Sequence, residues 1–357
     1  MRRSIAALLL AVLPAGSPLP ADPNPLAFQE PPPEETFGEE ITVTIHPLVV
    51  RVVDNVGNPV LGLGREDFAV RVGKADVPVS SVDWVNAGEA APEPAGEPGS
   101  EPAAVPVTVE TAPPGRTVVF FVQAGMHPTR IHGQLELREE TLDLLRRFPA
   151  DDRVAVVSFD SHLKLRHDLT RDREAVHRAL DRAILFDNEM VIRTAGEPDS
   201  LSARFDFDDA WKAASAERGL EVLANALKPF PGEKIVVYLG WGLGRFGGGG
   251  VKMIPAFYPA VRALRAARAT VFVLDITDAG YHSLEVGLGA VAAATGGTYT
   301  KTYLFPHLAT DYVARATSGY YVLTLDRDAL PEGGGAVTVE LRERRKGIVL
   351  ARPMILR

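Results

Sequence analysis

Residues 116–318 alternate short apolar runs with longer amphipathic segments. The runs have the length and the valine-rich composition of buried strands, and the segments between them have the period of helices. The expected strands are TVVFFV (117–122), RVAVVSFD (153–160), LKLRHDL (163–169), KIVVYLG (234–240), TVFVLDI (270–276) and TYTKTY (298–303). Strands that alternate with helices form a mostly parallel sheet with helices on both faces. The pattern therefore predicts an α/β, Rossmann-like, doubly wound region.

Three helices are predicted from apolar residues at the spacing of one helix face. The expected faces are Ile131, Leu135, Leu142 and Leu145 for the first, Trp211, Leu220, Leu223 and Leu227 for the second, and Leu284, Leu288, Val291 and Thr295 for the third. Asp206 or Asp208 is suited to cap the start of the second helix. Gly296 and Gly297 are suited to end the third helix at its C-terminus.

Two segments of β pattern flank the α/β region. Residues 41–85 and residues 319–357 each predict three short strands separated by turn residues. Either set alone is too small for a stable sheet. We therefore expect the two segments to pack together as a smaller all-β unit, with residues 116–318 inserted between them.

The remaining segments have a different composition. Residues 1–21 combine two arginines, an apolar run and a small residue at Ala21, which is the pattern of a cleaved secretory signal peptide. Residues 22–40 are rich in proline and acid, and residues 86–115 in Pro, Glu, Ala and Gly, which predicts a linker and a flexible tether. The chain has no cysteine, which excludes disulfides and suits a secreted or periplasmic bacterial protein.

Composition narrows the class of function. With 46% hydrophobic residues among 357, the chain can bury a full core. Its formal charge of −8 and the lack of a basic block make it a poor nucleic-acid binder. After the signal peptide no apolar run approaches the roughly 18 residues of a membrane span. No Gly-x-Ser-x-Gly or His-Glu-x-x-His motif is present, so no catalytic residue is predicted.

Several fragments, in order, resemble the bacterial, acidobacterial-type family related to von Willebrand factor type A (VWA) domains. TVVFFVQAGM (117–126) resembles the first VWA strand and its loop, and VVRVVDNVGNPVLGLGREDFAV (49–70) resembles the family's N-terminal segment. ATGGTYTKT (294–302) and ATSGYYVLTLD (316–326) resemble its C-terminal third. The resemblance covers residues 41–357 apart from the tether, and it implies a VWA-like fold.

The resemblance also implies a Mg²⁺ site with hard oxygen ligands, supplied by an Asp-x-Ser-x-Ser loop, a threonine and an aspartate. Here the first loop reads VQAGM (122–126), without the carboxylate or either hydroxyl. Gly240 and Trp241 occupy the place of the aspartate after the fourth strand. Thr194 alone cannot hold a cation. We therefore predict a degenerate metal-ion-dependent adhesion site that binds no metal.

Two alternatives stay open at this point. Gly242–Gly247 matches Gly-x-Gly-x-x-Gly after a strand, and Asp275 follows later, which is a pattern of nucleotide-binding enzymes. His127, His132, His162 and Asp160 fall in loops expected at one edge of the sheet, where a noncanonical metal-dependent adhesin can bind a transition metal.

The favoured interpretation is an exported protein–protein interaction module without metal, cofactor or catalysis. In open α/β sheets ligands bind beyond the carboxyl ends of the strands. The residues predicted to form that binding edge are Gln123, Met126, His127, Trp241, Arg245 and Phe246. Several are of types enriched at protein interfaces. Trp241 is equally compatible with packing under the glycine-rich loop. The expected partner is an unknown protein, with no nucleic acid and no membrane insertion.

Overall fold

The computed structural model describes residues 47–87, 116–185, 187, 191–342 and 345–356. The predicted signal peptide, the linker and nearly all of the tether lie outside these residues. The described residues belong to one compact unit, so the domain boundaries expected from the sequence stay a prediction. Among the described helices, none has the length and apolar character that crossing a bilayer requires.

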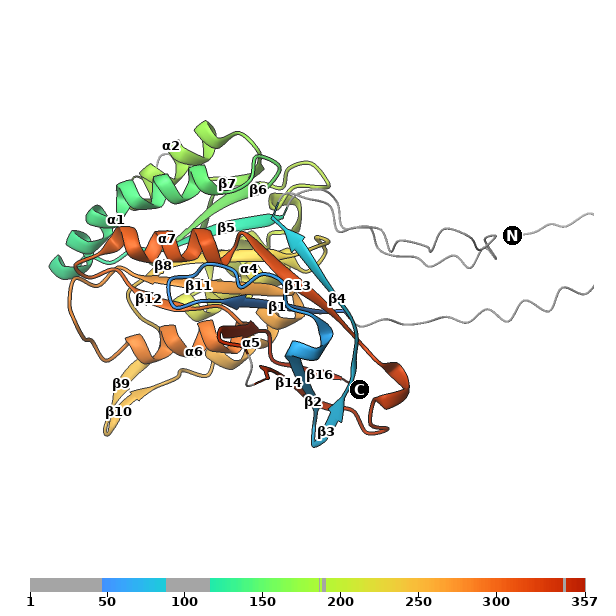
Figure 1. The fold of residues 1–357 in the computed structure, drawn as a ribbon. Coiled ribbons are helices and arrows are strands. Elements are labelled where there is room, and N and C mark those ends of the chain that lie inside the picture. The colour runs from blue at the N-terminus through green and yellow to red at the C-terminus, as the bar shows by residue number, and fades with distance from the viewer. Residues whose placement is uncertain (1–46, 88–115, 186, 188–190, 343–344, 357) are drawn as a thin grey trace, which may run out of the picture. The chain divides into compact units, whose positions relative to one another are not determined.

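A six-stranded sheet forms the centre of the α/β region (Figure 1). Its strands, in spatial order, are β12 (Tyr299–Lys301), β11 (Ala269–Asp275), β8 (Lys234–Gly240), β5 (Thr117–Gln123), β6 (Arg153–Phe159) and β7 (Leu163–Thr170). Neighbouring strands are parallel except β7, which runs antiparallel to β6. The chain enters at β5 in the middle and adds later strands on both sides, as in doubly wound sheets. The predicted fold class is confirmed, and all six predicted strands are present.

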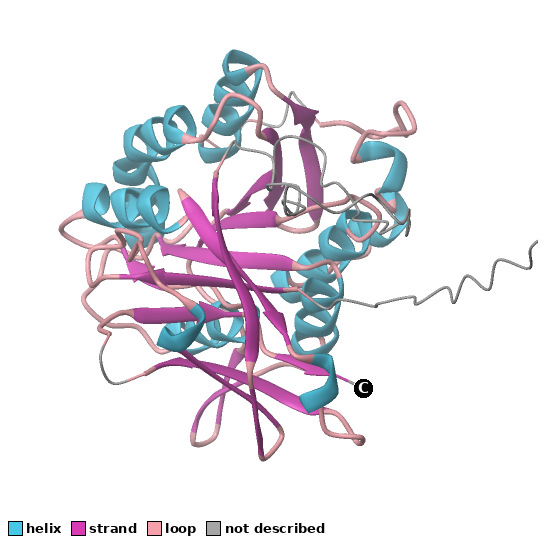
Figure 2. Ribbon diagram, turned by 45° about the vertical axis from the view of Figure 1, so that its right-hand side comes forward, coloured by secondary structure: helices cyan, strands magenta, loops and turns pink. Residues whose placement is uncertain are grey.

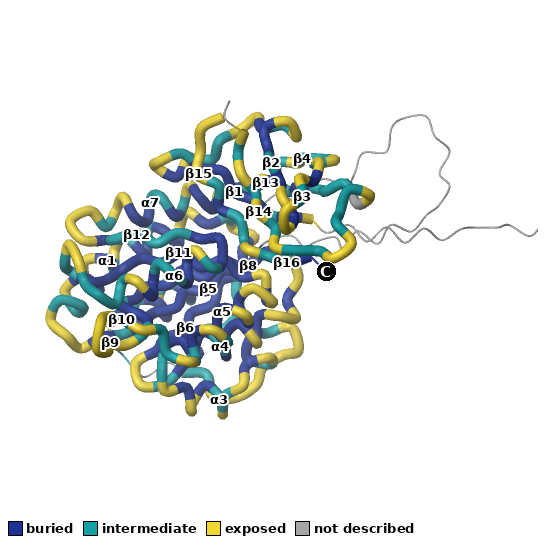
Figure 3. The backbone as a smooth tube through the Cα atoms, turned by 90° about the horizontal axis from the view of Figure 1, so that it is seen from below, coloured by how far each residue is buried: buried dark blue, intermediate teal, exposed yellow. Residues whose placement is uncertain are grey.

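Helices cover both faces of this sheet (Figure 2). One face packs against α1 (Pro128–Arg147), α2 (Arg173–Ile184) and α7 (Pro306–Ala316), and the other against α3 (Phe207–Trp211), α4 (Ala216–Leu227), α5 (Phe257–Ala266) and α6 (Glu285–Thr295). Strands β5, β8 and β11 are buried along their whole length, which explains their continuous apolar composition (Figure 3).

The predicted helix faces are partly wrong. In α1, Leu135 is 46% exposed, and Leu137 and Leu144 face the core instead. The second predicted helix is two helices, because Asp206 caps α3 and Ser215 caps α4. Trp211 ends α3 and is 68% exposed, so it does not belong to the buried face. Of the third face, Leu288, Val291 and Thr295 are buried in α6 as predicted, whereas Leu284 precedes the helix and is half-buried. Helix α6 ends at Gly296 in a left-handed conformation with φ of 74°.

The flanking segments pair with each other in two four-stranded antiparallel sheets. One contains β15 (Ile348–Ala351), β1 (Leu48–Val53), β13 (Gly319–Leu325) and β4 (Val79–Asn86); the other contains β16 (Met354–Leu356), β14 (Gly335–Leu341), β2 (Phe68–Val72) and β3 (Ala75–Val77). Their facing apolar side chains share one core around Tyr321 and Phe68. The predicted all-β unit is therefore confirmed.

Each flanking segment contains four strands among the described residues rather than the predicted three. Proline explains both differences, because it interrupts a strand by removing a backbone donor. Pro78 separates β3 from β4, and Pro353 separates β15 from β16. At each of these breaks the chain passes from one small sheet to the other. Three short 3₁₀ turns complete the described elements: η1 (Arg65–Asp67), η2 (Ser202–Arg204) and η3 (Arg327–Ala329).

Buried ion pairs lie near the ends of the central strands. Arg51 of β1 pairs with Glu233, the residue before β8, and both side chains are at least 97% buried. Burial, followed by the charge of Arg116, lowers the pKa of Arg51 to about 9, so Arg51 stays charged at neutral pH. Arg116, the residue before β5, pairs with Asp152 at 2.7 Å and donates to the carbonyl of Thr317. The Arg51–Glu233 pair ties the β unit to the central sheet.

Candidate functional site

The loops after β5 and β8 are joined by the side chain of Gln123. Its Nε2 donates to the carbonyl of Gly242 at 2.9 Å, and its Oε1 accepts from the amides of Trp241 and Gly242 at 3.0 and 3.2 Å. Gln123 is only 3% exposed. The structure therefore corrects its predicted place on the binding edge, because its amide holds two loops together beneath the surface.

Trp241 is half-buried between the same loops. Its indole Nε1 donates to the carbonyl of Ala124 at 3.0 Å, and its ring packs against the core on the α1 side. The guanidinium of Arg130 lies 3.4 Å from the centroid of the ring. A methyl group added at Gly125 would come within 2.9 Å of the indole, so the loop fits closely around it. These contacts favour the packing role for Trp241.

We accordingly expect Trp241→Ala to lower stability. Large-to-small replacement of a buried aromatic residue costs about 3–5 kcal/mol, and a half-buried tryptophan should lose roughly 2 kcal/mol. Urea denaturation of the variant measures the loss. Trp84→Ala, at another half-buried tryptophan, is the comparison, and it shows whether loss of any half-buried indole lowers stability by the same amount. An unchanged unfolding midpoint for Trp241→Ala would contradict the packing role and favour a role for this residue in binding.

The other four predicted residues are exposed at the carboxyl edge. Met126 is 76% exposed and follows β5, and His127 begins α1 with its Nδ1 2.9 Å from the hydroxyl of Thr129. Arg245 and Phe246 lie in β9 (Arg245–Gly247), which pairs with β10 (Gly250–Lys252) in a small hairpin after β8. Phe246 is 66% exposed. These four residues are available to a partner.

The hairpin contradicts the predicted nucleotide-binding loop. A dinucleotide fingerprint requires the glycine-rich turn to open a helix, whose N-terminus binds the pyrophosphate. Here Gly244 is followed by strand β9, and the next helix, α5, begins only at Phe257. The Gly244 amide instead donates to Glu217 at 2.6 Å. Without the strand–turn–helix context, the match to the glycine motif does not indicate a nucleotide-binding site.

A second group of exposed apolar residues, which was not predicted from the sequence, lies at the same edge. Tyr281, in the loop after β11, is 69% exposed. Leu304 and Phe305, in the loop after β12, are 65% and 56% exposed. Leu304 has φ of 70°, which is strained for a branched side chain and is typical of functional loops. The uninterrupted apolar run Tyr303–Phe305 before Pro306 was the signal that could have identified them.

Asp275 ends β11 at the centre of a buried polar network. Its Oδ2 lies 2.6 Å from the hydroxyl of Tyr299 and 2.6 Å from Nε2 of His282. Glu285 contacts the ammonium of Lys301 at 2.9 Å, which balances its charge. Burial, reinforced by the hydrogen bond to Asp275, raises the pKa of Tyr299, so its hydroxyl stays protonated. The network fixes the loops after β11 and β12.

The four residues of the predicted histidine edge are distributed over separate contacts. His132 lies 3.2 Å from Glu136 and 3.5 Å from Asp278, and the His162 ring contacts Trp211 at a tilt, with ring centroids 4.3 Å apart. Asp160 accepts from Lys164 at 2.5 Å. Among the described residues, the groups with metal-ligand spacing are His132–Glu136–Asp278 and Asp275–His282–Glu285. The predicted set of His127, His132, His162 and Asp160 is not among them.

Comparison with known proteins bears on the fold alone. No family model and no curated protein match the chain. A von Willebrand factor type A structure from Catenulispora acidiphila is 14% identical with a TM-score of 0.40, over 72% of this chain and 51% of that one. The vWF domain of the type V pili tip protein Mfa5 from Porphyromonas gingivalis is 11% identical with a TM-score of 0.37, over 56% of this chain and 94% of that one.

A third solved structure is longer than the region of similarity. Proximal thread matrix protein 1 from the mussel byssus is 14% identical with a TM-score of 0.37, over 57% of this chain and 47% of that one. The chain thus spans about half the length of this protein and of the Catenulispora protein. With TM-scores from 0.37 to 0.40, these likenesses carry no argument about function.

Proposed function

We propose that the chain is an exported protein-binding module of the acidobacterial-type VWA-related class, which works without metal, cofactor or chemistry of its own. Its binding face is the edge surface, which comprises Met126, His127, Arg245, Phe246, Tyr281, Leu304 and Phe305. One observation carries the proposal: large apolar side chains are exposed in the loops that follow β5, β8, β11 and β12.

The arrangement of the sheet supports a common surface. Strands β5, β8, β11 and β12 are parallel neighbours, so the loops at their carboxyl ends emerge at one edge. Monomeric soluble proteins rarely expose contiguous apolar patches of several hundred Å², and such patches mark interaction sites. The mixture of aromatic residues, Met and Arg is the one enriched at protein interfaces.

Metal independence is proposed from the groups that fill the loops after β5 and β8. The Gln123 amide is engaged by three hydrogen bonds to the β8 loop, and Arg130 places a positive charge over Trp241. A guanidinium at this position opposes binding of a divalent cation. Gln123 offers a neutral amide oxygen in place of a carboxylate.

Addition of millimolar Mg²⁺ or Mn²⁺ should therefore leave the melting temperature unchanged. A cation that binds only the folded state stabilises it by mass action, by about 2.7 kcal/mol at a hundredfold excess over the dissociation constant. Differential scanning calorimetry with and without each ion measures the effect, with EDTA-treated protein as the reference. A saturable upward shift with either ion would contradict metal independence.

The binding face can be tested by charge insertion at exposed positions. We expect Phe246→Asp, Tyr281→Asp and Phe305→Asp each to abolish retention of a partner captured by the wild-type chain from the source organism. Ile355→Asp in β16 is the matched control, because Ile355 is 68% exposed on the β unit. Interface hot spots lose about 2 kcal/mol or more on truncation. Retention by all three edge variants, measured by quantitative mass spectrometry, would reject the edge surface.

A further inference from the structure

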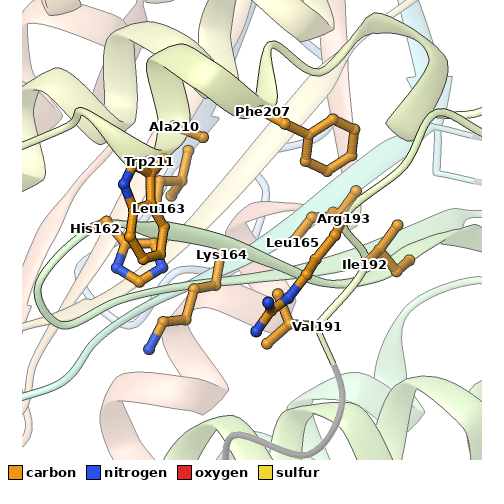
Figure 4. A pocket seen from close by; sticks show the side chains of 10 residues that line it. All are labelled: His162, Leu163, Lys164, Leu165, Val191, Ile192, Arg193, Phe207, Ala210 and Trp211. Carbon is orange, nitrogen blue, oxygen red and sulfur yellow. The ribbon is translucent and has the colours of Figure 1, made fainter.

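A pocket of about 390 Å³ lies along the outer edge of the central sheet. Its walls include Leu163 and Leu165 of β7, Ile192, and Phe207, Ala210 and Trp211 of α3 (Figure 4). The segment around Ile192 runs beside β7, where the Ile192 amide donates to the carbonyl of Leu165 at 2.8 Å. The sheet order places β7 at the edge opposite β12. Pockets of about 300–1,000 Å³ are the size that binds small molecules.

Aromatic rings form opposite parts of this pocket. The Trp211 indole contacts the His162 ring at a tilted angle of 57°, with centroids 4.3 Å apart, although Trp211 is 68% exposed. Phe207 lines the other end and packs on Phe205 at 5.2 Å (Figure 4). Tryptophan is rarely so exposed, because its large apolar area favours burial. The two rings and the aliphatic floor therefore offer a surface suited to a planar apolar group.

The cations at the pocket differ in how they are paired among the described residues. Lys164 is paired with Asp160 at 2.5 Å, and the guanidinium of Arg166 donates to Ser158 and to the carbonyl of Asp187. Arg193 lines the pocket and has no hydrogen bond or ion pair within the described parts of the chain. In Figure 4 the charged ends of Arg193 and Lys164 lie on the same side of the pocket.

The neighbouring histidine adds no positive charge at neutral pH. Burial lowers the pKa of His162, and the charge of Lys164 lowers it further, with a contribution from Arg193. Arg193 is therefore the cation left to pair with an anion. Its planar guanidinium suits a carboxylate, which it can bind through two parallel hydrogen bonds.

We propose that this pocket binds a small aromatic carboxylate. The ring of the ligand lies against Trp211, Phe207 and the aliphatic floor, and its carboxylate pairs with Arg193. This site is separate from the edge surface and does not depend on the function proposed for it.

Titration calorimetry with 2-naphthoate tests the proposal, and the neutral isostere 2-naphthamide reports on the apolar contribution alone. We expect saturable binding of 2-naphthoate to the full chain. Arg193→Gln should weaken it at least about tenfold, which corresponds to 1.4 kcal/mol, and leave the affinity for 2-naphthamide unchanged. Trp211→Ala should weaken both ligands. Arg193 and Trp211 are exposed, so neither change should affect the melting temperature.

A gain-of-affinity variant sharpens the test. Asp160→Asn removes one negative partner of Lys164, which makes the pocket more positive, and should strengthen binding of 2-naphthoate but not of 2-naphthamide. Arg71→Gln in β2 is the matched control and should change neither affinity. The proposal is overturned if 2-naphthoate shows no saturable binding up to roughly 5 mM, a concentration that would reveal a dissociation constant of about 1 mM. It is also overturned if Arg193→Gln affects the carboxylate and the amide equally.

Discussion

Replacing Arg51 by methionine should destabilise the protein by about 3–5 kcal/mol, since it leaves a buried carboxylate without its cation. Glu233, the partner, has a side chain that is 3% exposed. Arg51 also lies over the rings of Phe272 and Tyr320, at 5.7 and 5.8 Å from their centroids, so its removal loses packing as well. Urea unfolding followed by circular dichroism measures the change.

The double variant Arg51→Met/Glu233→Met separates charge from packing. Replacing a buried ion pair by apolar residues of similar volume is often neutral or stabilising. In this pair, Nε of Arg51 and Oε2 of Glu233 have no hydrogen-bond partner among the described residues, so the native pair is incompletely satisfied. We therefore expect the double variant to recover at least half of the lost stability. If the double variant is as unstable as Arg51→Met, the loss comes from packing and the electrostatic explanation is wrong.

Two glycine-to-alanine changes in helices should have opposite signs. Gly133 is buried in α1, and a methyl group there would lie 2.1 Å from the carbonyl oxygen of Ile276 in the loop after β11. The clash with backbone should outweigh the gain in helix propensity and destabilise the protein by about 2 kcal/mol. Gly289 in α6 has no atom within 4 Å of such a methyl group. Gly289→Ala should stabilise the protein by roughly 0.5–1 kcal/mol.

Thermal unfolding of the two variants beside the wild type compares these effects directly. Gly133→Ala also tests how the loop after β11 is held at the edge surface. Displacement of residues 276–278 would disturb the hydrogen bond of 3.1 Å from the Asp278 amide to the carbonyl of Thr129. Amide hydrogen exchange should therefore rise in the loop after β11. A stabilised Gly133→Ala protein would show that α1 does not approach this loop as closely as described.

The central sheet could be predicted because its strands are buried on both faces and their apolar runs are continuous. Helix faces were harder to predict. Ile131 and Leu135 have helical spacing, but α1 turns a neighbouring stripe with Leu137 and Leu144 toward the core. Which stripe is buried depends on the neighbouring elements, and that information lies elsewhere in the chain.

The candidate site could be predicted only in part, for similar reasons. Met126, His127 and Phe246 are exposed, and the topology fixes which loops share an edge, but their part in binding stays a prediction. Gln123 was misplaced, since its polar type suggested exposure and its partners are backbone groups of a distant loop. The pocket beside β7 combines residues from three separate segments, and no local pattern brings Ile192 and Phe207 together.

The central position of β13 has a consequence for the order of folding. The register pairs Leu48 of β1 with Leu323 of β13, and Trp84 of β4 with Tyr321, so strands from the two ends of the chain alternate within one sheet. Contacts between such distant residues form slowly, because a long loop must close first. The N-terminal strands have no partners in their sheet until β13 has been synthesised. During that interval their unpaired edges are exposed to aggregation.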